Sequence, residues 1–313
     1  MEGRRRKHHR DLWRLIRRST VAVVCVCLSQ FALYLISLFF SSYNIIPLTF
    51  LSLIVLIGMA VIGRRCNKLF GLRGSAPAFV FANLFFIWSV YLLVIHKAVS
   101  FLFDIVFHAE FIMLHFGLYR ILSGDPGFVK CGPLSNDEAN LEGSELPSSD
   151  VCEGSPSVES SLLLQRVKYC KHCDANVKGF DHHCPAFGNC IGRNNHLLFM
   201  ILLMGFIIAE ACYIVGASQI ATSRTLDSSG WTETLATSTM IFSLLQVLWQ
   251  AVFLGWHIYC VCFNIKTDEW IHWKQYPEFQ YIADPQPVTS VRYKNPYDKG
   301  IWLNLKEFIE AKG

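Results

Sequence analysis

A short polar stretch of this sequence gathers cysteine and histidine at the spacing of a metal site. It begins with two cysteines separated by two residues, Cys170 and Cys173, whose thiolates can bind one tetrahedral zinc ion together. Further ligands are available downstream, and they are His182, His183, Cys184 and Cys190. A reduced, cytosolic segment of this kind favours a metal over a disulfide. We therefore predict a zinc site between residues 170 and 190.

The same stretch holds more ligands than one zinc ion takes. A closed structural site has four ligands, so at least one cysteine and one histidine are left over. In Asp181-His182-His183-Cys184 a thiol stands beside imidazoles and a carboxylate, an arrangement that produces a nucleophilic thiolate at neutral pH. One histidine can bind the metal while the other takes the thiol proton, and Asp181 can orient that imidazole. The spacing does not say which histidine does which, and an alternative makes all of these residues zinc ligands or their neighbours.

The elements that must position this stretch are apolar helices. Apolar residues make up 52% of the chain, charged residues 17%, and the mean hydropathy is +0.34, which is more apolar than a soluble domain. A spanning helix needs roughly 20 mostly apolar residues, and six segments approach that length. They are Thr20–Ser41, Ile45–Ile62, Pro77–Ile95, Ala98–Leu122, Leu197–Ala217 and Thr239–Asn264. We therefore predict an all-α polytopic membrane protein of about six transmembrane helices, with a small zinc-binding, cysteine-rich cytosolic domain between helices 4 and 5.

Basic residues predict the orientation of these helices. Lysine and arginine concentrate before the first apolar segment and again in the loop that contains Arg64, Arg65, Lys68 and Arg73, and cytosolic loops carry such an excess. One pair of crossings separates the two groups, so both face the cytosol. The alternation then places the cysteine-rich stretch and the N- and C-termini there too. The net charge of +4 is local and does not indicate a nucleic-acid partner.

One predicted span contains ionisable residues. Asp104, His108 and His115 are separated by four and seven residues, so they fall near one face of the predicted helix Ala98–Leu122. We expect them to face the bundle interior or the membrane interface, and a second metal site is the alternative.

The residues around Cys184 resemble a known family. Asp-His-His-Cys-Pro and, downstream, Asn-Cys-Ile-Gly within residues 181–192 resemble the cysteine-rich domain of the DHHC protein S-acyltransferases, the palmitoyltransferases. Asp-Pro-Gly at 125–127 matches the DPG motif of that family, and Lys-Thr-Asp-Glu at 266–269 resembles its Thr-Thr-x-Glu motif. Asn-Pro-Tyr at 295–297 begins a stretch that resembles its C-terminal motif. The resemblance covers the chain from about residue 77 to residue 308.

The resemblance implies a protein S-acyltransferase, an enzyme that moves a long-chain fatty acyl group (palmitoyl) from acyl-CoA to cysteine thiols of proteins. Cys184 would carry the acyl group as a thioester, His182 would be the general base, and Asp181 would hold and polarise His182. Because the second histidine of the family motif binds zinc, the implied zinc ligands are Cys170, Cys173, His183 and Cys190. Thr267 would lie near Asp181, and Asn304 would hold the C-terminal tail against the cytosolic domain.

The sequence departs from the family pattern at several positions. A second zinc ion of the family would need an upstream cysteine pair, a histidine at 169 and a cysteine at 176. Residues 153–166 contain no cysteine, and the other two positions hold Tyr169 and Asn176. All four ligands of one ion are missing together, so we expect one zinc ion per chain. Ala186 replaces the tryptophan after the motif proline, and Lys266 replaces the first threonine of the Thr-Thr pair, which affects the acyl site and the support of Asp181.

Hydropathy and resemblance together predict seven segments. They are a basic cytosolic N-terminus (1–19), two additional N-terminal transmembrane helices (20–62), transmembrane helices 3 and 4 (77–122), the DPG motif with a disordered cytosolic linker (123–161), the cysteine-rich zinc domain (162–196), transmembrane helices 5 and 6 (197–264) and a cytosolic C-terminal tail (265–313).

The implied partners are acyl-CoA, protein substrates with membrane-proximal cysteines, and the lipid bilayer. The phosphates of CoA would need basic residues, and the candidates, each of which could equally be a solvated charge, are Lys168, Lys171, Lys178 and Arg193. The expected location is an endomembrane (Golgi or ER) or the plasma membrane, and the need for an accessory subunit is open. Two other functions compete with this interpretation: a zinc-bearing membrane adaptor without turnover, and a channel or transporter with a regulatory zinc domain.

Overall fold

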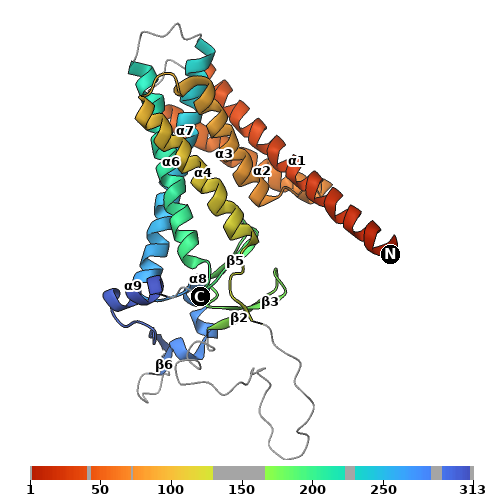
Figure 1. Ribbon diagram of the computed structural model, residues 1–313, viewed down its shortest axis with the longest axis vertical. Coiled ribbons are helices and arrows are strands. Elements are labelled where there is room, and N and C mark those ends of the chain that lie inside the picture. The colour runs from red at the N-terminus through yellow and green to blue at the C-terminus, as the bar shows by residue number, and fades with distance from the viewer. Residues whose placement is uncertain are drawn as a thin grey trace, which may run out of the picture. The chain divides into compact units, whose positions relative to one another are not determined.

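The computed structural model describes residues 2–40, 44–71, 73–129, 166–222, 230–282 and 291–310 (Figure 1). The predicted linker therefore lies, from residue 130 onward, outside the described residues. The chain divides into two compact units. The first comprises Met1–Ser123, Cys184–Gly188 and Leu198–Tyr259, and the second comprises Gly124–His183, Asn189–Leu197 and Cys260–Gly313.

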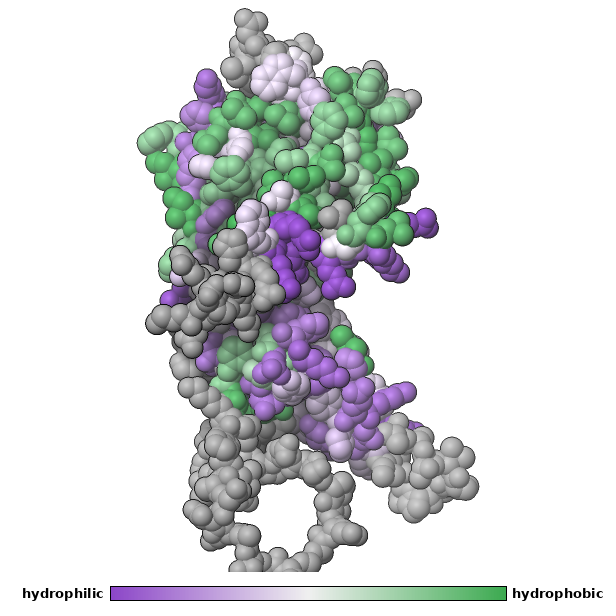
Figure 2. All heavy atoms as spheres, turned by 90° about the vertical axis from the view of Figure 1, so that its right-hand side faces the viewer, coloured by the Kyte–Doolittle hydropathy of each residue, from purple (hydrophilic) through white to green (hydrophobic). Residues whose placement is uncertain are grey.

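Six helices are long and apolar enough to cross a membrane. They are α1 (Glu2–Phe39), α2 (Ile45–Phe70), α3 (Ala76–Val90) with its π-helical continuation η1 (Tyr91–Ile95), α4 (Phe101–Ser123), α6 (His196–Thr222) and α7 (Gly230–Cys262). The cysteine-rich segment falls between the fourth and the fifth of them, α4 and α6. This confirms the predicted fold class. Over these helices the exposed side chains are mostly hydrophobic, green in Figure 2, as expected for surfaces that meet lipid.

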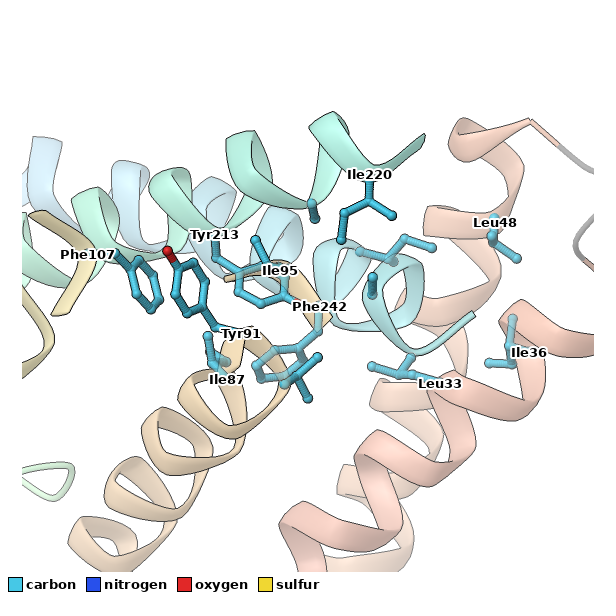
Figure 3. Packing of buried hydrophobic residues seen from close by; sticks show 14 residues of the cluster. Leu33, Ile36, Leu48, Ile87, Tyr91, Ile95, Phe107, Tyr213, Ile220 and Phe242 are labelled. Atoms are coloured by element: carbon cyan, nitrogen blue, oxygen red, sulfur yellow. The ribbon is translucent and has the colours of Figure 1, made fainter. Parts of the chain in front are cut away.

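The core of the first unit draws side chains from all six of these helices (Figure 3). Tyr91 stacks on Phe107 with ring centroids 3.8 Å apart, and Tyr213 is fully buried beside them. Leu33 of α1 and Leu48 of α2 belong to the same cluster. The two additional N-terminal helices are therefore packed into the bundle and are not a separate anchor.

Glycines allow α4 and α6 to approach closely. A Cβ atom added to Gly117 would lie 2.5 Å from Leu202 Cδ2, and one added to Gly205 would lie 2.9 Å from Leu114 Cδ2. Membrane helices associate largely through such packing, since lipid tails are as apolar as the side chains they contact.

The second unit contains the cysteine-rich segment, built from short antiparallel strands. The strands β1 (Phe128–Val129), β3 (Ala175–Lys178) and β2 (Val167–Cys170) form a sheet in the order β1-β3-β2. The strand β4 (His182–Cys184) pairs with β5 (Asn189–Ile191). The turn at Asp125–Gly127 leads into β1, where Asp125 Oδ1 accepts hydrogen bonds from the amides of Gly127 and Phe128 at 2.8 and 2.7 Å.

The C-terminal part of the second unit follows directly on α7. It consists of α8 (Thr267–Ile271), two 3₁₀ turns η2 (Trp273–Gln275) and η3 (Pro277–Phe279), the hairpin β6 (Gln280–Ile282) and β7 (Val291–Tyr293), and α9 (Ile301–Glu310). Asn304 of α9 is 1% exposed, and its Nδ2 donates to the carbonyl of Cys262 at 2.8 Å. Its Oδ1 accepts from the amide of Lys299 at 3.0 Å. One buried amide therefore ties the tail to the last residue of α7.

Replacing Asn304 by Ala should destabilise the tail by about 1–3 kcal/mol, because buried partners of its amide lose their hydrogen bonds. Limited proteolysis of the purified protein should then cut within residues 263–310 much faster than in the unchanged chain. Lys306→Ala, on the exposed side of the same helix, is the matched control and should leave the rate unchanged. Equal protection of the Asn304 variant and the unchanged chain would contradict this role.

Candidate active site and metal centre

Four of the predicted ligands converge in the cysteine-rich segment. His183 Nδ1 lies 3.8 Å from Cys170 Sγ, 3.5 Å from Cys173 Sγ and 3.7 Å from Cys190 Sγ. The Sγ atoms of Cys190 and Cys173 are 3.4 Å apart. All four ligand atoms lie within 4.8 Å of one another. In a tetrahedral site with Zn–S bonds of about 2.3 Å and a Zn–N bond of about 2.0 Å, ligand atoms are about 3.5–3.8 Å apart. The cluster therefore has the size and composition of a site for one zinc-like ion.

A hairpin turn brings two of these thiols together. Cys170 ends β2 opposite Ala175 of β3, and Cys173 sits in the turn between the strands. Asp174 closes the turn with φ 53°, a left-handed conformation that Asp adopts more readily than most residues. Tyr169 and Asn176 are direct partners across the same hairpin. The two positions that differ from the family pattern are thus neighbours, and Tyr169 OH donates to Asp174 Oδ1.

The strand β4 separates the two histidines of the motif. Successive side chains of a strand point to opposite faces, so His183 faces one way and His182 and Cys184 face the other. His183 points to the thiol cluster, and burial lowers its pKa, which favours the neutral imidazole that metals bind. Cys184 is not part of the metal-binding groups found among the described residues.

Asp181 is completely buried and is held by hydrogen bonds on all sides. Its Oδ2 lies 2.7 Å from His182 Nδ1, and its Oδ1 accepts from the backbone amide of Thr267 at 3.0 Å. Its own carbonyl accepts from the amide of Asp268 at 3.0 Å, and its amide donates to Ile191 at 2.8 Å. Thr267 therefore lies next to Asp181, and the contact is made by its backbone amide.

Positive charge compensates the burial of Asp181. Burial by itself would raise the pKa of this carboxyl, but His196, His182 and Lys266 oppose it and hold the pKa well below its usual range. Lys266 Nζ lies 3.3 Å from His196 Nδ1. The lysine that replaces a family threonine thus contributes to the charge around the carboxylate. Sequence reasoning did not assign a role to His196.

Arg166, to which the sequence assigned no role, holds the start of α8, the helix whose first amide bonds Asp181. Arg166 Nε and Nη2 donate to Glu269 at 2.9 and 2.8 Å, and its guanidinium lies 3.7 Å over the ring of Tyr297. Two further bonds of 2.8 Å reach the side chain and the carbonyl of Asn264. Glu269 Oε2 in turn accepts from the amide of Lys266 at 2.8 Å, a capping box for α8. The sequence could have predicted this capping box, because Glu269 stands three residues after the N-cap residue Lys266, the position of the acidic residue in such a box.

The residues after Cys184 pack on the first turns of two spanning helices. Cys184 is buried, and the turn that follows it closes with Gly188 donating to the carbonyl of Pro185 at 3.1 Å. Gly188 has φ +61°, and a Cβ atom there would lie 3.1 Å from Cγ of Pro77, the second residue of α3. Phe187 meets Phe199 of α6 edge-on, with ring centroids 5.9 Å apart. The Cys184–Gly188 segment therefore lies where α3 and α6 begin.

The four basic candidates for phosphate binding differ in their surroundings. Lys168 Nζ forms an ion pair with Asp268 and also donates to Tyr276 OH at 2.9 Å, so a carboxylate of the second unit neutralises its charge. Lys171 is exposed, while Lys178 and Arg193 are half-buried. Of the predicted ionisable cluster in α4, His108 lies 3.5 Å from Asp104, whereas His115 contacts the carbonyl of Phe111 instead.

Comparison with known proteins agrees with this geometry. The family model of the DHHC palmitoyltransferases matches residues 160–274. The chain is 27% identical over 225 residues to palmitoyltransferase ZDHHC17 of Mus musculus, and the aligned region covers 66% of this chain and 33% of that protein. It is 26% identical over 238 residues to palmitoyltransferase Hip14 of Drosophila melanogaster, covering 72% and 36%. It is 31% identical over 150 residues to the probable protein S-acyltransferase 5 of Arabidopsis thaliana, covering 45% and 28%.

The matched part of the chain spans about a third of the length of these curated relatives. The family match at residues 160–274 includes the thiol cluster, Asp181, His182 and Cys184, and it ends just beyond α8. The sequence resemblance is thereby confirmed over residues 160–274, which match the DHHC palmitoyltransferase family model.

Proposed function

We propose that this protein is a protein S-acyltransferase that moves a palmitoyl-type acyl group from acyl-CoA to cysteine thiols of membrane-associated proteins. The observation that carries the proposal is how the side chains of β4 are arranged relative to the thiol cluster and to Asp181. One strand gives His183 to a complete four-ligand cluster and leaves Cys184 outside it, on the face it shares with a histidine that is held by a buried carboxylate.

The proposed reaction has two thioester exchanges. With its Nδ1–H donated to Asp181, His182 can accept the Cys184 proton at Nε2, and the thiolate attacks the acyl-CoA carbonyl. The C–S bond to CoA breaks, and the CoA thiolate takes the proton from His182. The thiol of a protein substrate then gives its proton to His182 and attacks the acyl-Cys184 carbonyl, and the Cys184 thiolate leaves. Each step exchanges one thioester for another, so a reactive thiolate and correct positioning supply most of the catalysis.

Membrane embedding supports a long-chain substrate. Each methylene buried from water contributes about 0.8 kcal/mol, so a long acyl chain favours an apolar site. The turn after Cys184 packs against the beginnings of α3 and α6, and this packing supports a nucleophile at the end of spanning helices. We assign this end, with both termini, to the cytosol, and the compartment to the Golgi, the ER or the plasma membrane. The cytosolic side is supported by the basic residues around Arg18 and Arg64.

The first test is acyl transfer to the enzyme itself. Purified protein incubated with labelled palmitoyl-CoA should acquire a hydroxylamine-labile label, and Cys184→Ser should reduce the label to background because the nucleophile is lost. Cys66→Ser, which removes a half-buried cysteine of α2, is the matched control and should keep the label. A label that persists in Cys184→Ser, or its absence from the unchanged protein, would favour a membrane adaptor without turnover.

We further propose that Cys170, Cys173, His183 and Cys190 hold one zinc ion, whose role is to fix β4. Their separations match the edges of a zinc tetrahedron, and Tyr169 and Asn176 offer no second set of ligands. Elemental analysis of the purified chain should find one zinc per chain, and Cys173→Ala should lose it because three ligands do not close the site. Two zinc ions per chain, or one that remains in Cys173→Ala, would contradict this assignment.

Arg166 provides a test of how Asp181 is supported. Arg166→Lys should lower acyl transfer roughly ten- to a hundredfold, because lysine cannot reproduce the bidentate bond to Glu269 and small displacements of a reacting group are costly. Zinc content should stay at the unchanged value, since Arg166 contacts none of the ligands. Arg292→Lys, at an exposed arginine of β7, is the matched control. Unchanged turnover in Arg166→Lys would show that the contact to Glu269 does not support the active site.

A further inference from the structure

The two additional N-terminal helices bring two basic segments of the sequence together. The first segment is in α1 and contributes Arg17 and Arg18. The second is the end of α2 and the connection to α3, and it contributes Arg64, Arg65, Lys68 and Arg73. All six side chains are exposed, and we call them the basic site.

Backbone contacts join the two segments. After α2 the chain turns at Gly71, which has φ +63° and donates to the carbonyl of Asn67 at 3.0 Å. It then returns to α1, where the amide of Ser75 donates to the carbonyl of Arg18 at 2.9 Å, and a Cβ atom added to Gly74 would lie 3.7 Å from Ala22. Arg73 is therefore two residues from a hydrogen bond to Arg18.

The charge of the basic site is concentrated and of one sign. No aspartate or glutamate occurs between Asp11 and Asp104 in the sequence. Arg64 and Lys68 are four residues apart on α2, and Arg65 and Lys68 are three apart, spacings at which like charges repel on a helix. The preference of cytosolic segments for lysine and arginine explains why each segment is basic. This preference does not require the two segments to touch. Their contact brings like charges together, and a bound anion would reduce the repulsion between them.

The depth of these residues identifies the kind of anion. The apolar part of α1, Leu12–Phe39, has 28 residues, or about 42 Å of helix, which exceeds the hydrocarbon core of about 30 Å. The helix end with Arg17 and Arg18 therefore reaches the headgroup layer. Exposed apolar side chains stand among the charges, with Trp13 at 60%, Leu69 at 76% and Phe70 at 71% exposed. Tryptophan is typical of this layer of the membrane.

We propose that the basic site binds the phosphorylated headgroup of a polyanionic lipid in the leaflet that contacts the N-terminal end of α1. Clusters of lysine and arginine next to a spanning helix are attracted to such headgroups. This proposal concerns α1–α3 and does not depend on the acyl-transfer chemistry at Cys184. Its test can therefore fail while the proposed function stands, and the reverse also holds.

The experiment measures binding of fluorescent phosphatidylinositol 4,5-bisphosphate to the purified full-length chain in phosphatidylcholine nanodiscs, with phosphatidylinositol as the lipid without phosphomonoesters. The unchanged chain should bind the bisphosphate saturably and more tightly than phosphatidylinositol. Arg64→Gln with Lys68→Gln should bind it roughly thirtyfold more weakly, because each basic side chain near an anionic surface contributes a factor of about five. Lys299→Gln with Lys306→Gln removes the same charge from the C-terminal tail and should bind like the unchanged chain.

A second pair of variants guards against a change in membrane insertion. Arg17→Gln with Arg18→Gln should weaken binding to the same degree as the α2 variant, whereas Arg17→Lys with Arg18→Lys should retain it, since the charge is kept. Unchanged binding in both glutamine variants, or an equal loss in the tail control, would overturn the proposal. Displacement of the lipid by coenzyme A at equal concentration would assign the site to soluble phosphates and would overturn the choice of a lipid.

Discussion

A buried carboxylate, that of Asp181, organises the residues next to Cys184 and the start of α8. Asp181 has no access to water, and an uncompensated charge in that position would cost several kcal/mol. The chain compensates it with the Thr267 amide at the start of α8, with His182, and with the positive charge of Lys266 beside His196. Because α8 follows the last spanning helix, the need to satisfy Asp181 also fixes the beginning of the C-terminal tail. Arg166 and Glu269 then hold α8 in the position that this contact requires.

The thiol cluster solves a different problem, the positioning of a short strand with little core of its own. Only Cys170, Val177 and Cys190 form the fully buried apolar cluster here, which is small for a stable fold. The proposed ion would add the rigidity that hydrophobic burial does not provide, because it would join His183 of β4 to Cys190 of β5 and to the hairpin of Cys170 and Cys173. Because side chains alternate along a strand, the roles proposed for the adjacent histidines, His183 at a metal and His182 beside Cys184, do not compete. Where the family pattern has a second set of ligands, Tyr169 and Asn176 face each other across the hairpin.

The helical unit supplies an apolar environment and is itself held by packing. Its core includes residues of α1 and α2 as well as those of the four later spanning helices. Close approach of α4 and α6 at Gly117 and Gly205 replaces the hydrophobic driving force that is absent in lipid. A hydrogen bond from the Ser75 amide to the Arg18 carbonyl joins the basic segment of α1 to the connection that follows α2. The turn from Cys184 to Gly188 rests on the first turns of α3 and α6.

Local sequence determined much of this protein. Runs of about 20 apolar residues have one solution in a membrane, the helix, because every backbone group must be satisfied within the segment, and all six predicted spans are present. The Cys-x-x-Cys pair and the Asp-His-His-Cys run lie within a few residues of each other, so their chemistry could be predicted from spacing. Only the tertiary structure decided which distant residues complete the site. Arg166 meets Glu269 across 103 positions of the sequence, and Lys266 meets His196 across 70. Thr267 was expected beside Asp181, but only the structure shows that its backbone amide makes the contact. Such pairs depend on how the tail folds back after α7, and no periodicity or spacing in the sequence encodes that path.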